Sequence, residues 1–574
     1  MLAHTTTVAR VLLSVAFALT YRPVAAQSPS GQPADLILEH AAVFTPNGWA
    51  EAVAVRAERV VAVGPDAEME KLRSASTRTI DLQGRIVFPG LIDMHVHPLI
   101  AARRTLTGCH FNPGPPAQII AVVADCARSR AKGDWIVGGQ FGQGFVPTKQ
   151  MLDAVSPDNP VVLLDVSGHN AWANSKALAL AGITQSTQNP PGGVIERDAV
   201  GEPSGLLRET AAAVFARLIP PPTRAQNAHD LELALHLLLS FGVTSFTDAA
   251  ATRAELQAYD DLADGAKLKQ RVRACILWEP ESQKVPGIVD PLQEGRKFAR
   301  ERVSPSCVKF ILDGIPGPGR TAAFIDPYEP APGRPKDEHG SLMIPPDVLN
   351  SAVVRFDKAG LTTKFHATGD AAAREGLDAI EAARRANGPN GPRHEIAHAN
   401  FVQPSDIERA KRIRATLEFS PAIWGGGDRA SVGPMVAALG LGLARMERGW
   451  PVKEALDVGV MAVGGTDWPT APTPNVWPAI ETLVTRLRPG ITGEPVMARE
   501  RITLEQAIDL YTINAARQLG TETQEGSIEV GKRADLIVLD KNPFRIPIEQ
   551  VHAVKVELTL IDGHVVYDSS AVRE

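Results

Sequence analysis

Short runs in which apolar and polar residues alternate occur near both ends of the chain. Residues 34–64 contain ADLILEHAAVFT and AEAVAVRAERVVAVG, and the C-terminal part contains GSIEVGKRADLIVLDKNP and VELTLIDGHVVYD. Alternation with a period of two is typical of strands that bury one face. We therefore predict one small β-sandwich-like domain assembled from both termini, residues 34–85 plus 525–570.

The middle of the chain has a different pattern, in which unbroken apolar runs alternate with helix-like stretches such as AAAREGLDAIEAARRA and PSDIERAKRIR. Strands that are apolar on both faces are typical of a parallel sheet covered by helices. Eight such units predict a (β/α)8 barrel within residues 86–524. The eight candidate strands are residues 85–97, 242–250, 271–278, 307–314, 361–369, 393–401, 415–420 and 459–469.

The interval between the first and second candidate strands is too long for a structureless loop. It contains the strand-like runs WIVGGQF and PVVLLDVSGHNAW. We predict an inserted α/β subdomain over residues 105–235. Because β-to-α loops emerge at the catalytic end of such barrels, the insertion is expected to form one wall of the active site.

The first 26 residues differ from the rest of the chain. They contain no acidic residue, carry Arg10 before the apolar run VLLSVAFAL, and end in RPVAA. This pattern predicts a signal peptide, residues 1–26, cleaved after Ala26, and hence a secreted or periplasmic protein. An uncleaved anchor is the alternative. No other stretch approaches the ~20 apolar residues of a spanning helix, so no membrane domain is expected.

The composition, 44% apolar and 22% charged over 574 residues, is that of an ordinary globular protein. The net charge of -6 argues against a surface for nucleic acid or anionic membrane. Export would permit disulfides between the cysteines, and free buried thiols are the alternative. Four cysteines allow three pairings, of which Cys109 with Cys126 is the most local, and the absence of a CxxC spacing argues against a cysteine metal or redox site.

The sequence VFPGLIDMHVHP, residues 87–98, places two histidines one residue apart at the end of an apolar run. Side chains two apart on a strand point the same way, so His95 and His97 could hold one cation. Two polar residues where a strand enters a loop are the alternative. The other candidate strands carry further chemistry, most of it towards their carboxyl ends, at Lys309, His366, His398 and Asp467.

Each of these four residues also has a plain structural explanation. Lys309 could be an edge lysine, His366 and His398 could be core histidines with His394 the more exposed neighbour, and Asp467 could be a turn residue. All six residues fall on five strands of one predicted barrel, whose catalytic groups gather at the carboxyl ends. The combination therefore favours a shared site.

Longer motifs extend over residues 34–568 and carry a family resemblance. They include FPGLIDMHVHP, SGHNAWANSKALALAGI, GVTSFTDA, VKFILDG, FHATGDAA, HEIAHANFV, VGGTDWP and GSIEVGKRADLIVLDKNPF. The chain resembles the amidohydrolase superfamily of metal-dependent hydrolases, and in particular its amidohydrolase-3 (YtcJ-like) branch. One motif departs from the family pattern, since LEFSPAIW has Ser420 where many relatives have Gln, so we do not transfer substrate contacts to the seventh loop.

The resemblance implies one or two divalent metal ions. It assigns His95 and His97 to one ion, His366 and His398 to a second, and a CO2-carboxylated Lys309 to a bridge between them. Zinc suits this donor set best, with iron, manganese and nickel left open. Asp467 would bind or orient a water whose pKa the metal lowers to ~7, and would act as the general base.

We expect hydrolysis of a C–N bond, amide-like, in a small molecule. Ester or lactone hydrolysis and ring deamination are the enzymatic alternatives, and non-catalytic binding of metal or ligand is the alternative from another class. Weaker candidates for substrate contact are His169, Arg320, Tyr328 and Trp468. A helix cap would explain His169, and a loop ion pair Arg320, equally well, while core packing is the more common role of a large aromatic such as Trp468. No nucleic-acid partner is expected, and a homodimer is left open.

Overall fold

The computed structural model describes residues 32–571 apart from 112–113, 143–144, 166–169, 191–192, 281–286, 318–319, 333 and 424–426. The predicted signal peptide, residues 1–26, lies outside the described residues. Among the residues described, there is no helix with the length and apolar content needed to cross a bilayer.

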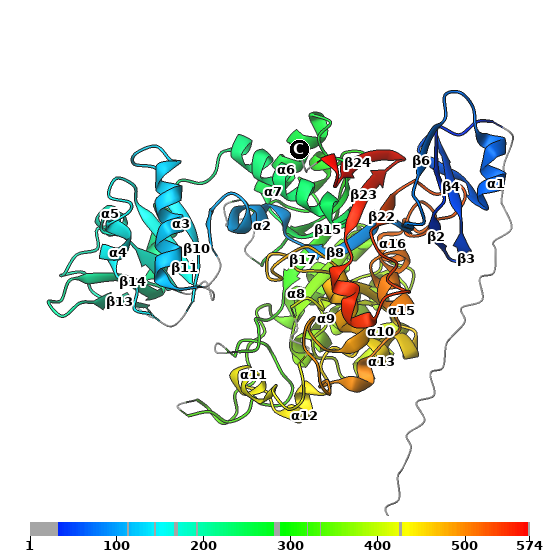
Figure 1. The fold of residues 1–574 in the computed structure, drawn as a ribbon. Helices are drawn as coiled ribbons and strands as arrows, with labels where there is room; N and C mark the ends of the chain where they lie inside the picture. The colour runs from blue at the N-terminus through cyan, green and yellow to red at the C-terminus, as the bar shows by residue number, and fades with distance from the viewer. Residues whose placement is uncertain are drawn as a thin grey trace, which may run out of the picture.

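The centre of the molecule is a sheet of eight parallel strands in the order β8-β15-β16-β17-β18-β19-β20-β21 (Figure 1). A bridge between Val96 of β8 and Trp468, in the segment that follows β21, brings the two edges of the sheet together, so the sheet curls into a nearly closed barrel. The predicted (β/α)8 fold is confirmed, and every candidate strand supplies one barrel strand. Their bounds are β8 (Leu91–Val96), β15 (Val243–Ala251), β16 (Arg271–Leu277), β17 (Val303–Ile311), β18 (Thr362–Ala367), β19 (Glu395–His398), β20 (Thr416–Phe419) and β21 (Met461–Gly464).

Helices cover the outside of the barrel, and local sequence explains where several of them begin. Thr223, Thr252 and Thr503 each accept a hydrogen bond in a capping box that starts α6, α7 and α15. The helices that follow the barrel strands include α2 (Pro98–Thr105), α6 (Arg224–Ser240), α7 (Arg253–Asp264), α8 (Pro346–Lys358), α9 (Asp370–Asn387), α10 (Pro404–Arg412), α11 (Gly433–Ala438), α12 (Leu443–Met446), α13 (Val452–Val458), α14 (Trp477–Thr485), α15 (Leu504–Leu510) and α16 (Ile513–Leu519).

Segments from both termini form two further sheets beside the barrel (Figure 1). One has the order β5-β4-β1-β6 and the other the order β24-β23-β22-β7-β2-β3. Their strands are β1 (Leu36–Glu39), β2 (Ala42–Thr45), β3 (Gly48–Ala50), β4 (Ala52–Arg56), β5 (Arg59–Gly64), β6 (Arg78–Asp81), β7 (Ile86–Pro89), β22 (Leu536–Leu539), β23 (Val556–Ile561) and β24 (His564–Asp568). A core of mainly Leu, Val and Ala side chains joins strands of the two sheets, and a second, smaller cluster lies on the other face of β1, β4 and β5 beside Met69 and Leu72.

The first candidate strand is divided between the two parts of the molecule. Residues Ile86–Pro89 form β7 of a terminal sheet, and Leu91–Val96 form β8 of the barrel. Gly90 lies between β7 and β8, at a position where an added Cβ would lie 2.2 Å from Oγ1 of Thr244. A larger residue at this position would therefore force the first two barrel strands apart.

The insertion between β8 and β15 has its own sheet, in the order β13-β14-β12-β11-β10-β9, and lies on the opposite side of the barrel from the terminal sheets (Figure 1). Helix α6, much of which falls within the predicted range 105–235, packs against α2 and α7 of the barrel. The elements of the insertion itself are β9 (Cys109–His110), α3 (Pro116–Arg128), β10 (Ile136–Phe141), α4 (Lys149–Asp153), β11 (Val161–Asp165), β12 (Asn170–Ala173), α5 (Ser175–Leu180), β13 (Gly193–Arg197) and β14 (Pro203–Glu209).

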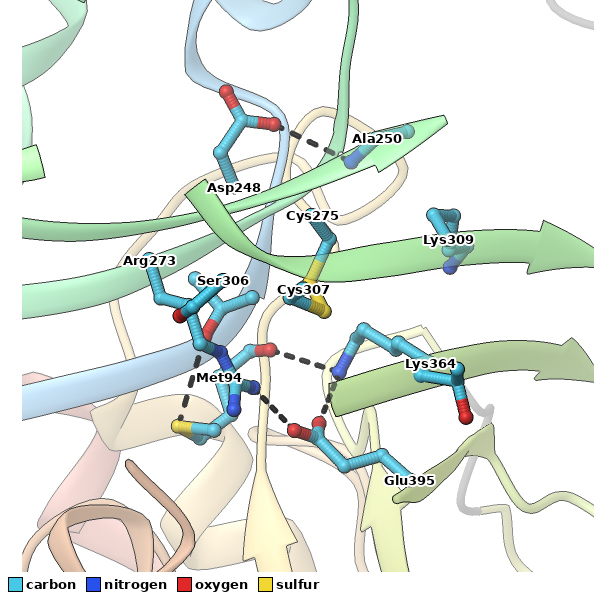
Figure 2. Close-up of a disulfide and its surroundings, with 12 residues drawn as sticks. Met94, Asp248, Ala250, Arg273, Cys275, Ser306, Cys307, Lys309, Lys364 and Glu395 are labelled. Atoms are coloured by element: carbon cyan, nitrogen blue, oxygen red, sulfur yellow. Dashed lines mark hydrogen bonds and ion pairs between the residues drawn. A yellow bond between two sulfur atoms is a disulfide. The ribbon is translucent and has the colours of Figure 1, made fainter. Parts of the chain in front are cut away.

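All four cysteines are paired. Cys109 of β9 is joined to Cys126 of α3, which is the local pairing that the sequence favoured, and Cys275 of β16 is joined to Cys307 of β17. The second disulfide links neighbouring barrel strands at directly opposed positions, two residues before Lys309 (Figure 2). The alternative of free buried thiols is excluded.

Candidate active site

Five of the six predicted ligands or bases form direct contacts at the carboxyl end of the barrel. The Nε2 atom of His95 lies 3.5 Å from Nζ of Lys309 and 3.6 Å from Oδ1 of Asp467. Nε2 of His97 lies 3.3 Å from the same carboxylate oxygen. The rings of His95 and His398 have centroids 4.6 Å apart. Side chains from β8, β17, β19 and the segment after β21 thus meet at one point.

His366, the sixth predicted residue, joins this group through His398. Their ring centroids are 4.5 Å apart. Nε2 of His366 is 3.2 Å from the carbonyl oxygen of Gly314 in the loop after β17. The structure therefore brings all six residues into one continuous cluster.

Two residues of the cluster have unusual backbone conformations. His398 has φ 68° and Asp467 has φ 56°, in the left-handed region that non-glycine residues rarely adopt. The N–H of Asp467 donates to the carbonyl oxygen of His95 at 2.7 Å, which holds the last strand against the first. Such conformations cost energy and concentrate at functional sites, where the surrounding structure imposes them.

Burial keeps the rings of His95, His366 and His398 uncharged. It lowers the pKa of His95 well below its ordinary value, and lowers the pKa values of His366 and His398 to about 4 and about 3; the nearby Lys309 contributes to all three shifts. The neutral rings retain a nitrogen lone pair at neutral pH, which is the form that binds metal.

The two other groups of the cluster respond differently to burial. Burial and the nearby ammonium of Lys364 lower the pKa of Lys309 to about 7. Burial alone would raise the pKa of Asp467, but His95, a hydrogen bond from His97 and the proximity of His398 hold it well below its usual range. The cluster therefore offers an amine that can lose its proton and a carboxylate that keeps its charge.

These donors suit a divalent transition metal. His95, His97 and Asp467 have ligand atoms within 4.8 Å of one another, and so do His95, His398 and Glu418. Imidazole nitrogens combined with a carboxylate oxygen are the donor set that zinc and similar ions prefer. The residues present thus fit the metal centre that the sequence predicts.

Sequence reasoning missed the charged residues beneath this cluster. Glu418 of β20 accepts a hydrogen bond from Nδ1 of His95 at 2.6 Å. Lys364 of β18 contacts Glu395 of β19 at 2.7 Å, and Arg273 of β16 pairs with the same glutamate (Figure 2). All four are buried in the barrel interior. In the sequence, each of these residues is recognisable only as a charged residue within an otherwise apolar strand.

The weaker candidates for substrate contact have protein partners. Arg320 is paired with Glu338 at 3.1 Å and bonded to the carbonyl oxygen of Glu329. The hydroxyl of Tyr328 donates to the carbonyl oxygen of Ala322 at 2.9 Å, and Trp468 is a buried core residue. These contacts match the structural alternatives of a loop ion pair and core packing.

Two further expectations concern neighbouring residues. His169 lies outside the described residues, while the nearby Asn174 caps α5 by accepting a hydrogen bond from Ala177. The expectation that His394 is exposed is wrong. It is fully buried, because Asp357 and Thr363 bond to its two ring nitrogens.

Comparison with known proteins agrees with this geometry. Residues 78–567 match the model of the amidohydrolase family, Amidohydro_3, so the chain belongs to that family. It is similar to YtcJ of Bacillus subtilis (strain 168), with 29% identity over 87% of this chain and 92% of that protein. It is also similar to the N-substituted formamide deformylase of Arthrobacter pascens, with 29% identity over 94% and 99% of the two chains.

A solved structure shares the fold over nearly the whole chain. An uncharacterized metal-dependent hydrolase from Pyrococcus furiosus superposes with a TM-score of 0.69 at 25% identity, covering 89% of this chain and all of that one. The predicted resemblance to the YtcJ-like branch is confirmed. The protein is an enzyme, a hydrolase that acts on carbon–nitrogen bonds other than peptide bonds.

Proposed function

We propose that this protein is a metal-dependent hydrolase that cleaves an amide-like bond of a small molecule. The observation that carries the proposal is the convergence of four imidazoles, Lys309 and Asp467 at one buried point of the barrel. Similarity to a formamide deformylase over almost the full length of both chains supports amide cleavage over the ester, lactone and deamination alternatives.

The geometry supports an assignment of the ligands to two metal ions. His95 and His97 would hold one ion together with Asp467, and His366 and His398 would hold a second. Zinc is the ion that the donor set favours. When bound, the metal would supply Lewis acidity, lowering the pKa of a water to ~7 and polarising the scissile carbonyl.

Asp467 would move the proton during the reaction. Its carboxylate is ionised and held within 3.6 Å of both histidines of the first pair. It can therefore accept a proton from the attacking water and return it to the leaving nitrogen. His95 and His97 orient this carboxylate through the contacts that keep its pKa low.

Lys309 would bridge the two ions as a carbamate formed from its amine and CO2, with release of one proton. Only a neutral amine can react in this way, and the lowered pKa of Lys309, about 7, supplies it. Lys364, the other buried lysine nearby, is instead paired with Glu395 at 2.7 Å. This contrast supports Lys309 as the modified residue.

The test is elemental analysis of the purified protein after dialysis without chelator, followed by hydrolysis assays. Substrates should include N-substituted formamides, N-acyl amino acids, esters and aminopurines. We expect two zinc equivalents per chain and turnover of an amide, lost on chelation and restored by zinc. One zinc equivalent per chain would remain consistent with a metal-dependent hydrolase but would contradict the bridging role of Lys309. An absence of bound metal, with no response to zinc, would contradict the proposal.

We also propose that the protein is exported, with cleavage after Ala26. The apolar run that follows Arg10 supports a signal peptide. The disulfides Cys109–Cys126 and Cys275–Cys307 suit an oxidising compartment. Sequencing the N-terminus of protein recovered from a bacterial periplasm should begin at Gln27, with no thiol that reacts before reduction. An intact N-terminus in the cytoplasmic fraction would contradict export.

A further inference from the structure

The two ring nitrogens of His95 face different neighbours. Nε2 faces Lys309 and Asp467, where the proposed metal would lie. Nδ1 points the other way and lies 2.6 Å from Oε2 of Glu418. Both side chains are essentially inaccessible to solvent, at 1% and 0% exposure. A solvent molecule therefore cannot take the place of the carboxylate at Nδ1.

Glu418 is itself held by several donors. Lys364 places its ammonium 3.5 Å from the oxygen that faces His95. The hydroxyl of Ser420 donates to the other oxygen at 2.9 Å. The Lys364 ammonium is fixed in turn by Glu395 at 2.7 Å and by the carbonyl oxygen of Met94 at 3.0 Å (Figure 2). A carboxylate surrounded by donors acts as an acceptor, so the proton of the His95 ring lies on Nδ1.

We propose that Glu418 is a positioning residue of the active site. It holds His95 in the tautomer that is protonated on Nδ1, so that the Nε2 lone pair is aimed at the metal. Lys364 fixes Glu418 from the barrel interior. A hydrogen bond from the second nitrogen of a metal-binding histidine to a carboxylate fixes the ring and increases its basicity. This inference rests on the proposed metal centre and adds the residues that hold one of its ligands in place.

The test measures zinc affinity of the metal-free full-length protein by competition with a chelator, alongside its thermal unfolding. In E418Q the amide N–H2 can donate to Nδ1 and so favours the other tautomer. We expect zinc binding to weaken about 10- to 100-fold, the usual cost of losing such a partner. A purely structural role would change thermal unfolding and leave zinc affinity unaltered.

A matched control exists elsewhere in the chain. Glu481 of α14 accepts a hydrogen bond from Nδ1 of His552 at 2.7 Å and is 3% exposed. Among the described residues its carboxylate pairs with His552 and with no proposed metal ligand, and the same Glu-to-Gln change can be made there. E481Q is expected to bind zinc as the wild type does.

The outcomes separate this inference from the function on which it rests. Wild-type protein that binds no zinc would contradict the metal centre itself. Wild-type affinity in E418Q, with zinc bound by the unmodified protein, would overturn the positioning role alone. If E418Q does not fold, E418D keeps the charge while withdrawing the carboxylate from Nδ1. Weaker zinc binding by E418D would then support the role, and unchanged binding would overturn it.

Discussion

At the residue scale, the chemistry of the site depends on charge states that burial sets. Burial removes the positive charge from the rings of His95, His366 and His398 and lowers the pKa of Lys309 to about 7. The same burial would protonate Asp467 if His95, His97 and His398 did not oppose it. Asp467 is therefore an ionised base despite its burial, and it should act in turnover more than in binding.

Replacement of Asp467 by asparagine tests this conclusion. D467N keeps the size of the side chain but cannot take up a proton. We expect kcat to fall by about 10²- to 10⁴-fold, the range of general-base contributions, with a small change in KM. Steady-state kinetics should be accompanied by metal analysis, to separate loss of the base from loss of an ion. Near wild-type turnover in D467N would exclude the role.

A second residue-scale prediction concerns Glu375 of α9, whose carboxylate oxygens are buried without a hydrogen-bond partner among the described residues. Burial, with Asp378 and Asp313 nearby, raises its pKa to about 7. A raised carboxyl pKa means that stability is fully present below the unfolded pKa of about 4.5 and is lost as pH rises through about 7.

E375Q should therefore be more stable than the wild type at about pH 8, by on the order of 1–3 kcal/mol, and equally stable at about pH 4. Chemical denaturation at both pH values measures the difference. Equal stability at the higher pH would mean that the carboxylate has a partner in solution.

Sequence alone could predict the six residues of the candidate cluster because each lies on a barrel strand or just beyond one. It could not predict Glu418 or Lys364. A charged residue within a strand is ordinarily read as an edge or surface position, and the reason for burying it appears only when the barrel closes. Glu418 lies beside His95, 323 residues away in the chain, and no local pattern carries that information.

At the element scale, the junction between the first and last barrel strands carries the site. Gly465 packs so closely on β8 that an added Cβ would lie 2.4 Å from Cβ and 2.8 Å from the backbone nitrogen of His95. Asp93 reinforces the junction by accepting from Thr466 at 2.6 Å. His95 and Asp467 therefore lie on one closely packed junction between the first and last barrel strands.

G465A should displace His95 without changing the identity of His95 or Asp467, the two proposed ligands at this junction. We expect weaker zinc binding and lower turnover than in the wild type, with the protein still folded, because the clash with His95 can be relieved by a local shift of that residue and the end of its strand. Zinc competition and circular dichroism would measure the two properties. G433A, at a glycine with no positive φ and no atom within 4 Å of an added Cβ, serves as the control for metal binding. Wild-type zinc affinity in G465A would show that the junction between the two strands can absorb the added methyl group without displacing His95.

The elements themselves were largely predictable, since the eight apolar runs all became barrel strands. The division of residues 85–97 into β7 and β8 was not, because both halves are equally apolar. The distinction depends on where Gly90 allows the chain to pass Thr244, a contact between segments far apart in the sequence. Patterning thus predicts that a strand forms, and tertiary contacts decide which sheet it joins.

At the scale of the whole molecule, a buried ion cluster joins the barrel to the terminal sheets. Arg271 at the start of β16 is paired with Asp535 at 2.6 Å and with Asp562, both from the C-terminal segment. Arg302 of the barrel contacts Asp562 at 2.6 Å. Asp535 and Asp562 are 4% and 3% exposed, so they depend on these cations for compensation. Arg271 is the cation that both carboxylates share.

R271M keeps the apolar stem of the side chain and removes its charge. Breaking a buried pair by removing one partner costs about 3–5 kcal/mol, and we expect a loss of that order in the free energy of unfolding. Burial already raises the pKa of Asp535 to about 6 despite Arg271, and without the arginine it should rise further. The loss of unfolding free energy in R271M, relative to the wild type, should therefore grow as pH rises through neutrality. The double variant R271M/D535N should recover part of that loss. If R271M unfolds like the wild type at about pH 8, the ion cluster contributes nothing to holding the terminal sheets on the barrel.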